Sequence, residues 1–571
     1  MTQIKVGDYL FKRLHELGIR AVFGVPGDYE LALLDLITDN DLEWKGNPNE
    51  LVAAYAADGY ARVKGAAACV TTFGPGETSA YCGMAGHFCE FVPVVHIVGY
   101  PTIQAIRKKA IMHHSLGNGK FDMYVEMVKQ IMADTTVIDY PPLAASEIDR
   151  VLNTMMYEQR PVYIGLSIDI ALEMISDAPL GCPISRTLPP NDPEVEKSVV
   201  SKIRNGLERA DNPIIVIDGG AARHDVLSEA HEFVKLTRIP FFTTPMGKGS
   251  VNEDLPQYGG VHFGAGTHPG VKNAMESSDF VLIIGNFPSD FNTGEFTCVF
   301  NKNIIEFVDF QRFSVSIGEI KYPVSMKFVL QGLNKDLQRS KLMKAAQKVT
   351  WNPYPTLEFS PSEHLKQDFL WPTLGSFFRP GDYIIGETGT SAFGLCDSRL
   401  PAGAVMHNQT IFGSIGYATG AIVGVAQAVK ESGGKWKRPI LVTGEGSMHL
   451  TIQVLQDLLR FDLKPIIFVL NNGGYTVERL IHGKEALYND VAVIDYGLLG
   501  STFGPGVPSK YYGPIRTNGQ LEELLKDKDF GNAGCSELVE LILKPLDAPK
   551  ALVRVGVAVD KFNKGNVTGA A

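Results

Sequence analysis

Short apolar runs alternate with segments of helical periodicity along the whole chain. Short runs of this kind between helical segments predict strands of parallel sheets, buried on both faces. The pattern therefore predicts an α/β protein in which mostly parallel sheets are flanked by helices. We expect strands in the ranges 21–25, 68–74, 92–99, 161–168, 213–220, 279–287, 303–310, 383–389, 439–446 and 465–472.

Two proline-containing stretches interrupt this alternation and predict three domains. The first, near residues 179–193, cannot continue a helix or a strand ladder, and the second spans 351–365. We predict domains at 1–180, 190–350 and 360–571. The first and third could be distant copies of one design, a question that periodicity alone leaves open.

Composition and charge narrow the function classes. The 571 residues are 45% hydrophobic and 20% charged, which is typical of a folded globular chain. The formal net charge of -10 and the lack of a Lys/Arg-rich run argue against nucleic-acid or anionic-membrane partners. A small anionic substrate remains compatible, because local dipoles and side chains attract it inside a cleft.

The cysteines and the N-terminal segment favour a cytoplasmic protein. The seven cysteines are scattered, without a CxxC pair or zinc spacing, and we interpret them as reduced packing residues. The first 18 residues alternate charged and apolar positions and do not resemble a signal peptide. No apolar run approaches the length of a membrane span.

An acid between two glycines, Glu445, follows one predicted strand and Asn472 ends the next. Neighbouring parallel strands would bring both side chains to one sheet edge, where open α/β sheets bind ligands. With a carbonyl from Gly474 they form an oxygen-only set suited to Mg²⁺ and a phosphate group. Taken alone, the "GEGS" segment could be a simple turn. The intervening segment predicts one helix with a common apolar side formed by Leu450, Val454, Leu455, Leu458 and Leu459.

This spacing resembles the thiamine-diphosphate signature of GDG followed by NN, with Glu445 where that pattern usually has Asp. Other segments extend the resemblance over almost the whole chain and are similar to pyruvate decarboxylases, particularly the fungal type. They are "VFGVPGDYE", "NELVAAYAADGYARVKG", "TTFGPGETSA", "HHSLGNG", "GETGTSAFG", "FGSIGYATGA" and "NNGGYTVERLIHG".

The resemblance implies three α/β domains of the thiamine-diphosphate-binding fold. The first binds the cofactor's pyrimidine, the second is structural or regulatory, and the third binds diphosphate and Mg²⁺. It implies non-oxidative decarboxylation of a 2-oxo acid, most simply pyruvate to acetaldehyde and CO₂, through a cofactor carbanion and enamine. It also implies a homodimer or homotetramer with active sites at the dimer interface.

Five candidate catalytic residues follow from the resemblance. Glu50 would hydrogen-bond the pyrimidine and needs a raised pKa; from its position alone it could simply complement a helix dipole. The other four would handle protons, although separately they could be a cap, a solvated loop or a surface acid. They are Asp28, His113, His114 and Glu478.

The resemblance also assigns binding residues. Ile415 would bend the cofactor, although by pattern alone it could be a core residue. The expected cofactor-binding residues are Thr390, Gly413, Ser414, Ile415, Gly446, Ser447, Asn472, Gly474, Tyr475 and Thr476. A substrate pocket, or ordinary packing, would involve Phe291, Ala392, Phe393 and Val477.

Other functions stay open at this point. A decarboxylase of indolepyruvate or phenylpyruvate is the nearest alternative, and a carboligase fits the tandem histidines less well. A non-catalytic filament or scaffold relative would not need the catalytic set.

Some yeast relatives carry cysteines in the middle domain that are linked to activation. In this sequence that segment reads Gly219, Gly220, Ala221, Ala222, so a thiol switch there is excluded.

Overall fold

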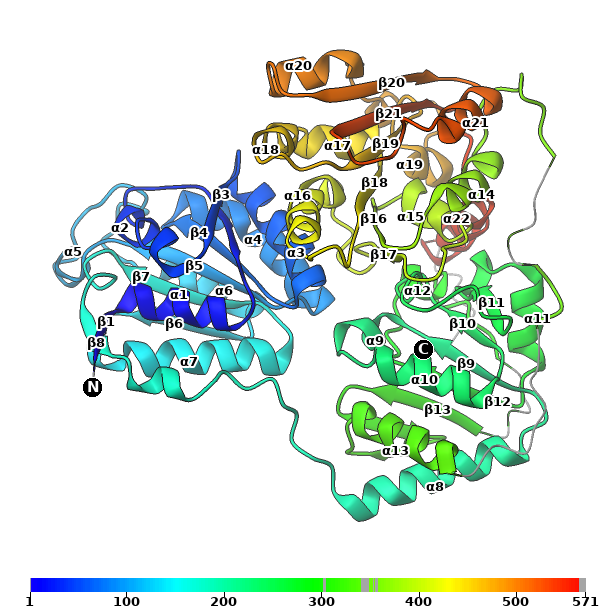
Figure 1. Cartoon of the computed structure of the whole chain (residues 1–571), viewed down its shortest axis with the longest axis horizontal. Helices are drawn as coiled ribbons and strands as arrows, with labels where there is room; N and C mark the ends of the chain where they lie inside the picture. Colours follow the sequence, from blue (N-terminus) through cyan, green and yellow to red (C-terminus); the bar gives the residue numbers. More distant parts are fainter. Residues whose placement is uncertain are drawn as a thin grey trace.

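The computed structural model describes residues 2–300, 304, 306–339, 349–352, 354 and 358–563. These residues form three α/β domains, each built around one sheet (Figure 1). The first domain, blue to cyan, lies beside the yellow-to-red third domain, and the green central domain lies below the third. The predicted fold class is confirmed.

The first domain contains six parallel strands with helices on both faces. Its central strands are entirely buried, which explains their continuous apolar sequence. In spatial order the strands are β3 (Glu43–Gly46), β2 (Ala21–Gly24), β4 (Ala67–Thr72), β5 (Val94–Tyr100), β7 (Val162–Ser167) and β6 (Asp134–Ile138). The longer helices are α1 (Val6–Glu16), α3 (Glu50–Lys64), α4 (Pro75–Glu90) and α7 (Pro141–Glu158).

The third domain repeats this topology. With strands numbered along each domain, the spatial order is 2-1-3-4-6-5 in both, and all pairs are parallel. This identity favours the idea that the two domains share one design. The strands are β17 (Val405–His407), β16 (Asp382–Gly386), β18 (Arg438–Gly444), β19 (Ile466–Asn471), β21 (Ser536–Ile542) and β20 (Ser509–Ile515). Its helices include α14 (Gln367–Phe377), α15 (Thr390–Leu395), α16 (Tyr417–Lys430), α19 (Thr476–Ile481), α21 (Asn518–Lys526) and α22 (Lys550–Asn563).

The central domain has a seven-stranded sheet in which all neighbouring strands are parallel except the last two pairs, which are antiparallel. In spatial order the strands are β11 (Tyr258–Val261), β10 (Phe241–Thr243), β9 (Pro213–Ile217), β12 (Phe280–Ile284), β13 (Glu306–Gln311), β14 (Ser314–Ile317) and β15 (Ile320–Tyr322). Its helices include α8 (Pro193–Arg209), α9 (Gly219–Arg223), α10 (Leu227–Thr237), α11 (Pro269–Ser277), α12 (Asp290–Thr293) and α13 (Met326–Arg339).

Two local predictions are wrong. Pro193 is not part of the linker but the first residue of α8, where its missing N–H costs nothing, and Asp192 caps that helix. The single helix expected after "GEGS" is two short ones, α17 (Glu445–Thr451) and α18 (Val454–Arg460). The break leaves Leu450 half exposed, while Val454 and Leu458 are buried. Within 351–365, residues 353 and 355–357 lie outside the described residues.

The first and third domains pack through α3 and α16, which approach closely at glycines (Figure 1). A Cβ on Gly424 would lie 1.7 Å from Ala56 O, and one on Gly59 would lie 2.1 Å from Ala421 O. Only glycine permits such contact between helix backbones. The crossing also lets the Tyr55 hydroxyl reach Ser414 Oγ at 2.6 Å, just before α16 begins.

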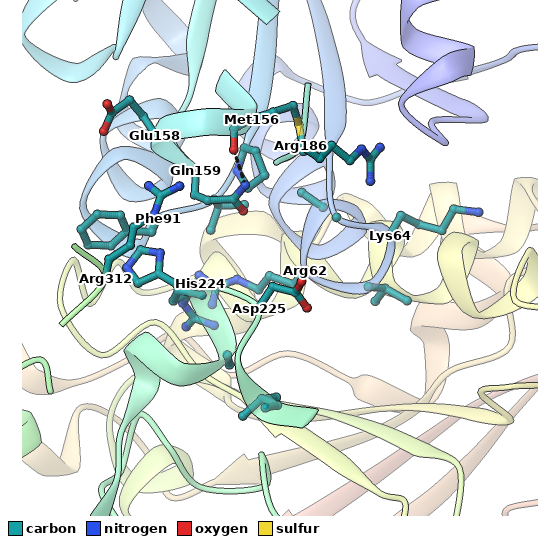
Figure 2. A pocket seen from close by; sticks show the side chains of 18 of the residues that line it. Arg62, Lys64, Phe91, Met156, Glu158, Gln159, Arg186, His224, Asp225 and Arg312 are labelled. Carbon is teal, nitrogen blue, oxygen red and sulfur yellow. Dashed lines mark hydrogen bonds between the residues drawn. The ribbon is translucent and has the colours of Figure 1, made fainter. Parts of the chain in front are cut away.

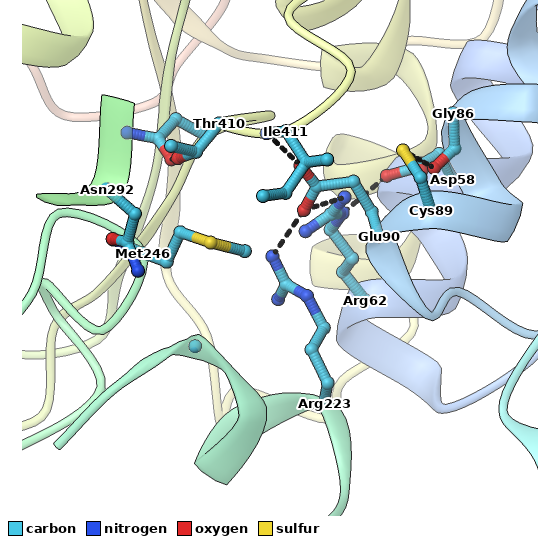
Figure 3. Close-up of polar contacts among 12 residues, drawn as sticks. Asp58, Arg62, Gly86, Cys89, Glu90, Arg223, Met246, Asn292, Thr410 and Ile411 are labelled. Atoms are coloured by element: carbon cyan, nitrogen blue, oxygen red, sulfur yellow. Dashed lines mark hydrogen bonds and ion pairs between the residues drawn. The ribbon is translucent and has the colours of Figure 1, made fainter. Parts of the chain in front are cut away.

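A buried charge network joins all three domains (Figure 3). Glu90, at the end of α4, accepts a hydrogen bond from Ile411 N at 2.8 Å and one from Arg223 Nη2 at 3.2 Å. Arg62 lies 3.7 Å from the same carboxylate. Buried charges are tolerated only when paired in this way. The network therefore fixes the loop after Ile411, which carries several predicted cofactor contacts.

Candidate active site

A cavity of about 270 Å³ lies at the carboxyl edge of the third-domain sheet and faces the central domain. The predicted residues that line it are Phe291, Thr390, Ala392, Phe393, Gly413, Ile415, Glu445, Gly446, Ser447, Asn472, Gly474, Tyr475, Thr476, Val477 and Glu478. Ser414 is the one predicted binding residue outside this lining; its hydroxyl contacts Tyr55 and its N–H donates to Gln409 Oε1 at 2.9 Å.

The ends of β18 and β19 bring Glu445 and Asn472 together, as the crossover predicts. Gly444 is paired with Leu470 in the sheet, so the residues that follow leave the same edge. Glu445 Oε1 accepts hydrogen bonds from Gly474 N at 2.7 Å and Asn472 N at 3.3 Å. The turn after β19 is thus held on the Glu445 carboxylate.

Oxygen-bearing groups of Glu445, Asn472 and Gly474 lie together at this point. The Asn472 amide faces Gly474 O at 2.6 Å and Glu445 Oε1 at 3.1 Å; its hydrogen bonds are satisfied when its nitrogen donates to both and its oxygen accepts from Thr476 Oγ1 at 2.8 Å. Rotation of the amide group turns its oxygen to the same point. A carboxylate, an amide oxygen and a backbone carbonyl are hard ligands of the kind that Mg²⁺ prefers. The residues present therefore fit a divalent cation.

Burial raises the pKa of the Glu445 carboxyl to about 7, although the N–H groups of Gly474 and Asn472 oppose the shift. Among the residues that the structure describes, burial and backbone hydrogen bonds, and not a cationic side chain, determine this shift; a bound cation would supply a partner for the negative charge. Gly446 follows directly. A Cβ at this position would lie 2.6 Å from the Tyr475 ring, so only glycine lets Tyr475 cover the start of α17.

The apolar wall of the cavity contains two phenylalanines. Phe291 from α12 and Phe393 from α15 meet edge to face, with ring centroids 5.9 Å apart. Across the cavity, Val477 approaches Gly389, where a Cβ would lie 3.6 Å from it. This wall limits the space beside Glu478 and favours a small substrate.

Sequence reasoning missed several lining residues: Pro245, Thr388, Gly389, Cys396, Asn408, Gln409, Thr410 and Gly444. Pro245 comes shortly after β10 of the central domain, and residues 408–410 follow β17. Both segments follow carboxyl ends of parallel strands, where ligands bind in such sheets. Their position directly after these strand ends is the sequence signal by which these lining residues could have been predicted.

The first domain carries a second cluster, formed by Asp28, His113 and His114. His113 Nε2 and Asp28 Oδ2 are 2.9 Å apart, and both side chains are about half exposed. The Tyr29 ring stacks on His113 with centroids 4.9 Å apart. One ligand atom from each of Asp28, His113 and His114 lies within 4.8 Å of the others, so one small group can contact all three, and the Asp28–His113 pair is within hydrogen-bond distance.

Glu50 begins α3, and Asn49 caps that helix by accepting a hydrogen bond from Val52 N at 2.8 Å. Burial raises the pKa of the Glu50 carboxyl, opposed by a backbone hydrogen bond. This is the direction that its predicted proton-sharing role requires.

The two sets occupy different places in one chain. Glu478 lines the third-domain cavity, whereas Asp28, Glu50, His113 and His114 do not. A single chain therefore does not bring the whole predicted catalytic set to this cavity.

A larger cavity, of about 1100 Å³, lies between the three domains (Figure 2). Basic side chains including Arg62, Arg186 and Arg312 line it. The end of α9 also reaches it, through Ala222 and Arg223.

No helix in the described ranges is both long and apolar enough to cross a membrane.

Three family models match the chain in order: "Thiamine pyrophosphate enzyme, N-terminal TPP binding domain" at 4–119, its central domain at 200–329, and its C-terminal TPP binding domain at 385–495.

Curated relatives match nearly the full length. Pyruvate decarboxylase isozyme 1 of Saccharomyces cerevisiae is 43% identical over 97% of this chain and 98% of its own. The pyruvate decarboxylases of Candida glabrata and Aspergillus terreus are each 42% identical, over 97% and 96% of this chain and 98% and 96% of theirs. The chain belongs to the pyruvate decarboxylase family of thiamine-diphosphate-dependent carboxy-lyases.

Proposed function

We propose that this chain decarboxylates pyruvate to acetaldehyde and CO₂ at the third-domain cavity. The observation that carries the proposal is the meeting of the Glu445 carboxylate, the Asn472 amide and the Gly474 carbonyl beside a small apolar pocket that contains Glu478. Membership of the family supports the same reaction.

Glu445, Asn472 and the Gly474 carbonyl would hold Mg²⁺. The N–H of Gly446 and the hydroxyl of Ser447 lie on the same rim and would bind the diphosphate. Tyr475 and Thr476 line the neighbouring wall, and Thr476 Oγ1 is anchored to Pro545 O at 2.8 Å. Bound thiamine diphosphate supplies a carbanion and an electron sink, which side chains lack.

Thr390, Gly413 and Ile415 would hold the rest of the cofactor. Ile415 is a partly exposed isoleucine at the cavity, so its side chain is available to contact a bound group. An apolar side chain there would orient the cofactor by shape, with Ser414 fixed beside it through Tyr55.

The remaining residues would handle protons. Glu50 would hold a proton in its partly buried carboxyl and share it with a ring nitrogen. The Asp28–His113 pair, His114 and Glu478 would deliver one proton after CO₂ leaves and remove another when the aldehyde is released. Phe291, Ala392, Phe393 and Val477 would exclude water from the substrate.

A complete site then needs a second copy of the chain. The first-domain cluster lies outside the cavity of its own chain, so a partner's first domain would supply it. We propose a homodimer as the minimal unit. The homotetramer and the cytoplasmic location stay predictions.

Substrate size separates the main alternatives. The Phe291–Phe393 wall favours pyruvate, whereas a decarboxylase of indolepyruvate or phenylpyruvate would need more room. A ratio of kcat/KM for phenylpyruvate over pyruvate above one would reverse this choice. A non-catalytic scaffold is disfavoured, because it would not need a buried carboxylate, an amide and a backbone carbonyl together at the edge of a cavity.

The direct test is to measure CO₂ and acetaldehyde formed from pyruvate by chelator-stripped protein. We expect both products only after thiamine diphosphate and Mg²⁺ are returned together. Equal product formation without them, or no product with them, would rule the proposal out.

A binding test separates the cation site from turnover. Saturating cofactor and Mg²⁺ should raise the melting temperature, since a ligand at 100 times its Kd adds about 2.7 kcal/mol of stability. Glu445→Gln should lose most of this rise because it removes a charged ligand. Glu537→Gln, a buried glutamate of β21 outside the cavity, is the matched control and should keep it. An undiminished rise in Glu445→Gln would show that the cation binds elsewhere.

A further inference from the structure

A buried carboxyl, Glu30, lies next to the first-domain cluster, and no step proposed above uses it. Its side chain is only 1% exposed. It follows Asp28 by two residues, in the turn between β2 and α2 (Leu31–Leu34). A glutamate in this setting is rarely buried unless it is paired or has a role.

The surroundings of Glu30 are the carboxyl ends of two central strands. A Cβ on Gly99 of β5 would lie 2.6 Å from Glu30 Oε2, and one on Gly27 would lie 3.0 Å from Glu30 Oε1. The same Gly27 Cβ would lie 2.7 Å from Oγ1 of Thr72, the last residue of β4. Two glycines therefore make the space that this side chain fills.

Neither carboxylate oxygen of Glu30 has a hydrogen-bond partner among the described residues, and Thr72 Oγ1 also has none. Burying an unpaired charge is costly, so the neutral form is favoured. Burial raises the pKa of Glu30 to about 7, and the charge of Asp28 adds to the rise; the nearby Thr72 hydroxyl and Gly27 backbone lower it in part. The group thus changes charge near neutrality.

Asp28 is the charged group that acts on Glu30. β4 and β5 present Thr72 and Gly99 to it, which carry no charge, and Gly27 is part of its own turn. Asp28 in turn contacts His113 Nε2 at 2.9 Å, and the intervening Tyr29 stacks on the His113 ring. A negative charge on Glu30 therefore acts electrostatically on Asp28, the acid that is paired with His113.

The cluster is also tied to the same strand ends through its backbone. After β4, Gly74 packs against the loop of the histidines, where a Cβ would lie 2.1 Å from His114 O. Tyr124 donates a hydrogen bond to that same His114 carbonyl at 3.0 Å. The loop is held in place independently of Glu30, so removing its charge should change electrostatics rather than geometry.

We propose that Glu30 is a positioning residue of the Asp28–His113–His114 cluster, whose negative charge keeps a proton on the Asp28–His113 pair and so sets the pH range of the reaction. The part of this inference that concerns the pH range of the reaction rests on the proposed function. The part that concerns protonation of the cluster is independent of the proposed function.

The test uses the full-length protein and hydrogen–deuterium exchange at histidine C2, followed by mass spectrometry across pH. The negative charge of Glu30 stabilises protonated His113. Replacing Glu30 by a neutral residue of similar size removes this stabilisation. We expect Glu30→Gln and Glu30→Met to move the His113 exchange midpoint to lower pH by about 0.5 to 1 unit. The midpoint of His364, in the third domain, should not move.

Glu537→Gln is the matched control, a buried glutamate of β21 with no contact to the cluster, and should leave the His113 midpoint unchanged. An unchanged midpoint in both folded Glu30 variants would overturn the proposal. Loss of the fold in both would overturn it too, because Glu30 would then be a structural residue.

Activity gives the second readout. The alkaline limb of kcat/KM against pH should shift to lower pH by a similar amount in Glu30→Gln. If the parent protein decarboxylates pyruvate and neither readout shifts, only the inference about Glu30 fails. If the parent shows no activity, the proposed function fails while the exchange measurement still decides the role of Glu30.

Discussion

At the scale of single residues, Glu50 combines a capped helix start with a half-buried carboxyl. The sequence predicted its place in a helix's first turn, and the resemblance predicted its role. Glu445 and Asn472 were predicted from strand order alone, because adjacent parallel strands end at one edge. The burial of Glu30 was not predicted. It depends on two glycines: Gly99 is far from Glu30 in sequence, and Gly27 reads only as part of a turn.

Glu50→Gln should lower kcat on pyruvate by about 100-fold or more, because the amide cannot share the proton with the cofactor. The rise in melting temperature caused by the cofactor and Mg²⁺ should persist, since the proposed binding site for the diphosphate and Mg²⁺ lies in the third domain. Turnover is measured with Glu43→Gln, an exposed glutamate of β3, as the control. Unchanged kcat in Glu50→Gln would remove Glu50 from the mechanism.

At the scale of elements, short helices explain where sequence reasoning failed. Apolar periodicity over 450–459 suggested one helix, but the chain breaks between α17 and α18. The break follows tertiary packing that periodicity does not encode: Thr451 Oγ1 donates to Gly416 O at 2.8 Å, at the start of α16. Each expected strand range overlaps a strand of the structure, because burial on both faces makes such sequences continuously apolar. Other strands were not expected, among them the edge strands β3, β6, β17 and β20 and the buried strand β21.

Helix α18 also contacts the first domain through a buried carboxyl, Asp457, which accepts a hydrogen bond from Asn47 Nδ2 at 2.8 Å. Its other oxygen has no partner in the described residues. Burial raises the pKa of Asp457 to about 7. Between pH 4 and 7 the folded chain keeps a proton that the unfolded chain has released, so this group lowers stability progressively as pH rises through that window.

Asp457→Asn should therefore stabilise the protein at pH 8, by about 1–3 kcal/mol, and bring little gain at pH 4.5. The amide oxygen can still accept the bond from Asn47. Thermal midpoints at both pH values measure the effect, and Asp462→Asn, an exposed site, is the control. The same gain at both pH values would show that ionisation of Asp457 is not the cause.

At the scale of the whole molecule, the first and third domains share one strand order and pack through α3 and α16. Sequence patterns predicted three domains, and the resemblance supplied the residues of both chemical clusters and implied active sites at a dimer interface, which already separates the two clusters within one chain. That separation depends on how the domains pack, where side chains far apart in sequence meet, as in the Glu90–Arg223–Ile411 network.

The proposed active site combines the third-domain cavity of one chain with the first domain of another. Complementation between two inactive variants, Glu50→Gln and Glu478→Gln, tests it most directly. In a mixed dimer, one of the two sites combines an intact first domain with an intact third domain. Co-expression in equal amounts, followed by an acetaldehyde assay, should recover about a quarter of parental activity, whereas each variant alone stays inactive. No recovery from a mixed population shown to contain heterodimers would contradict the claim.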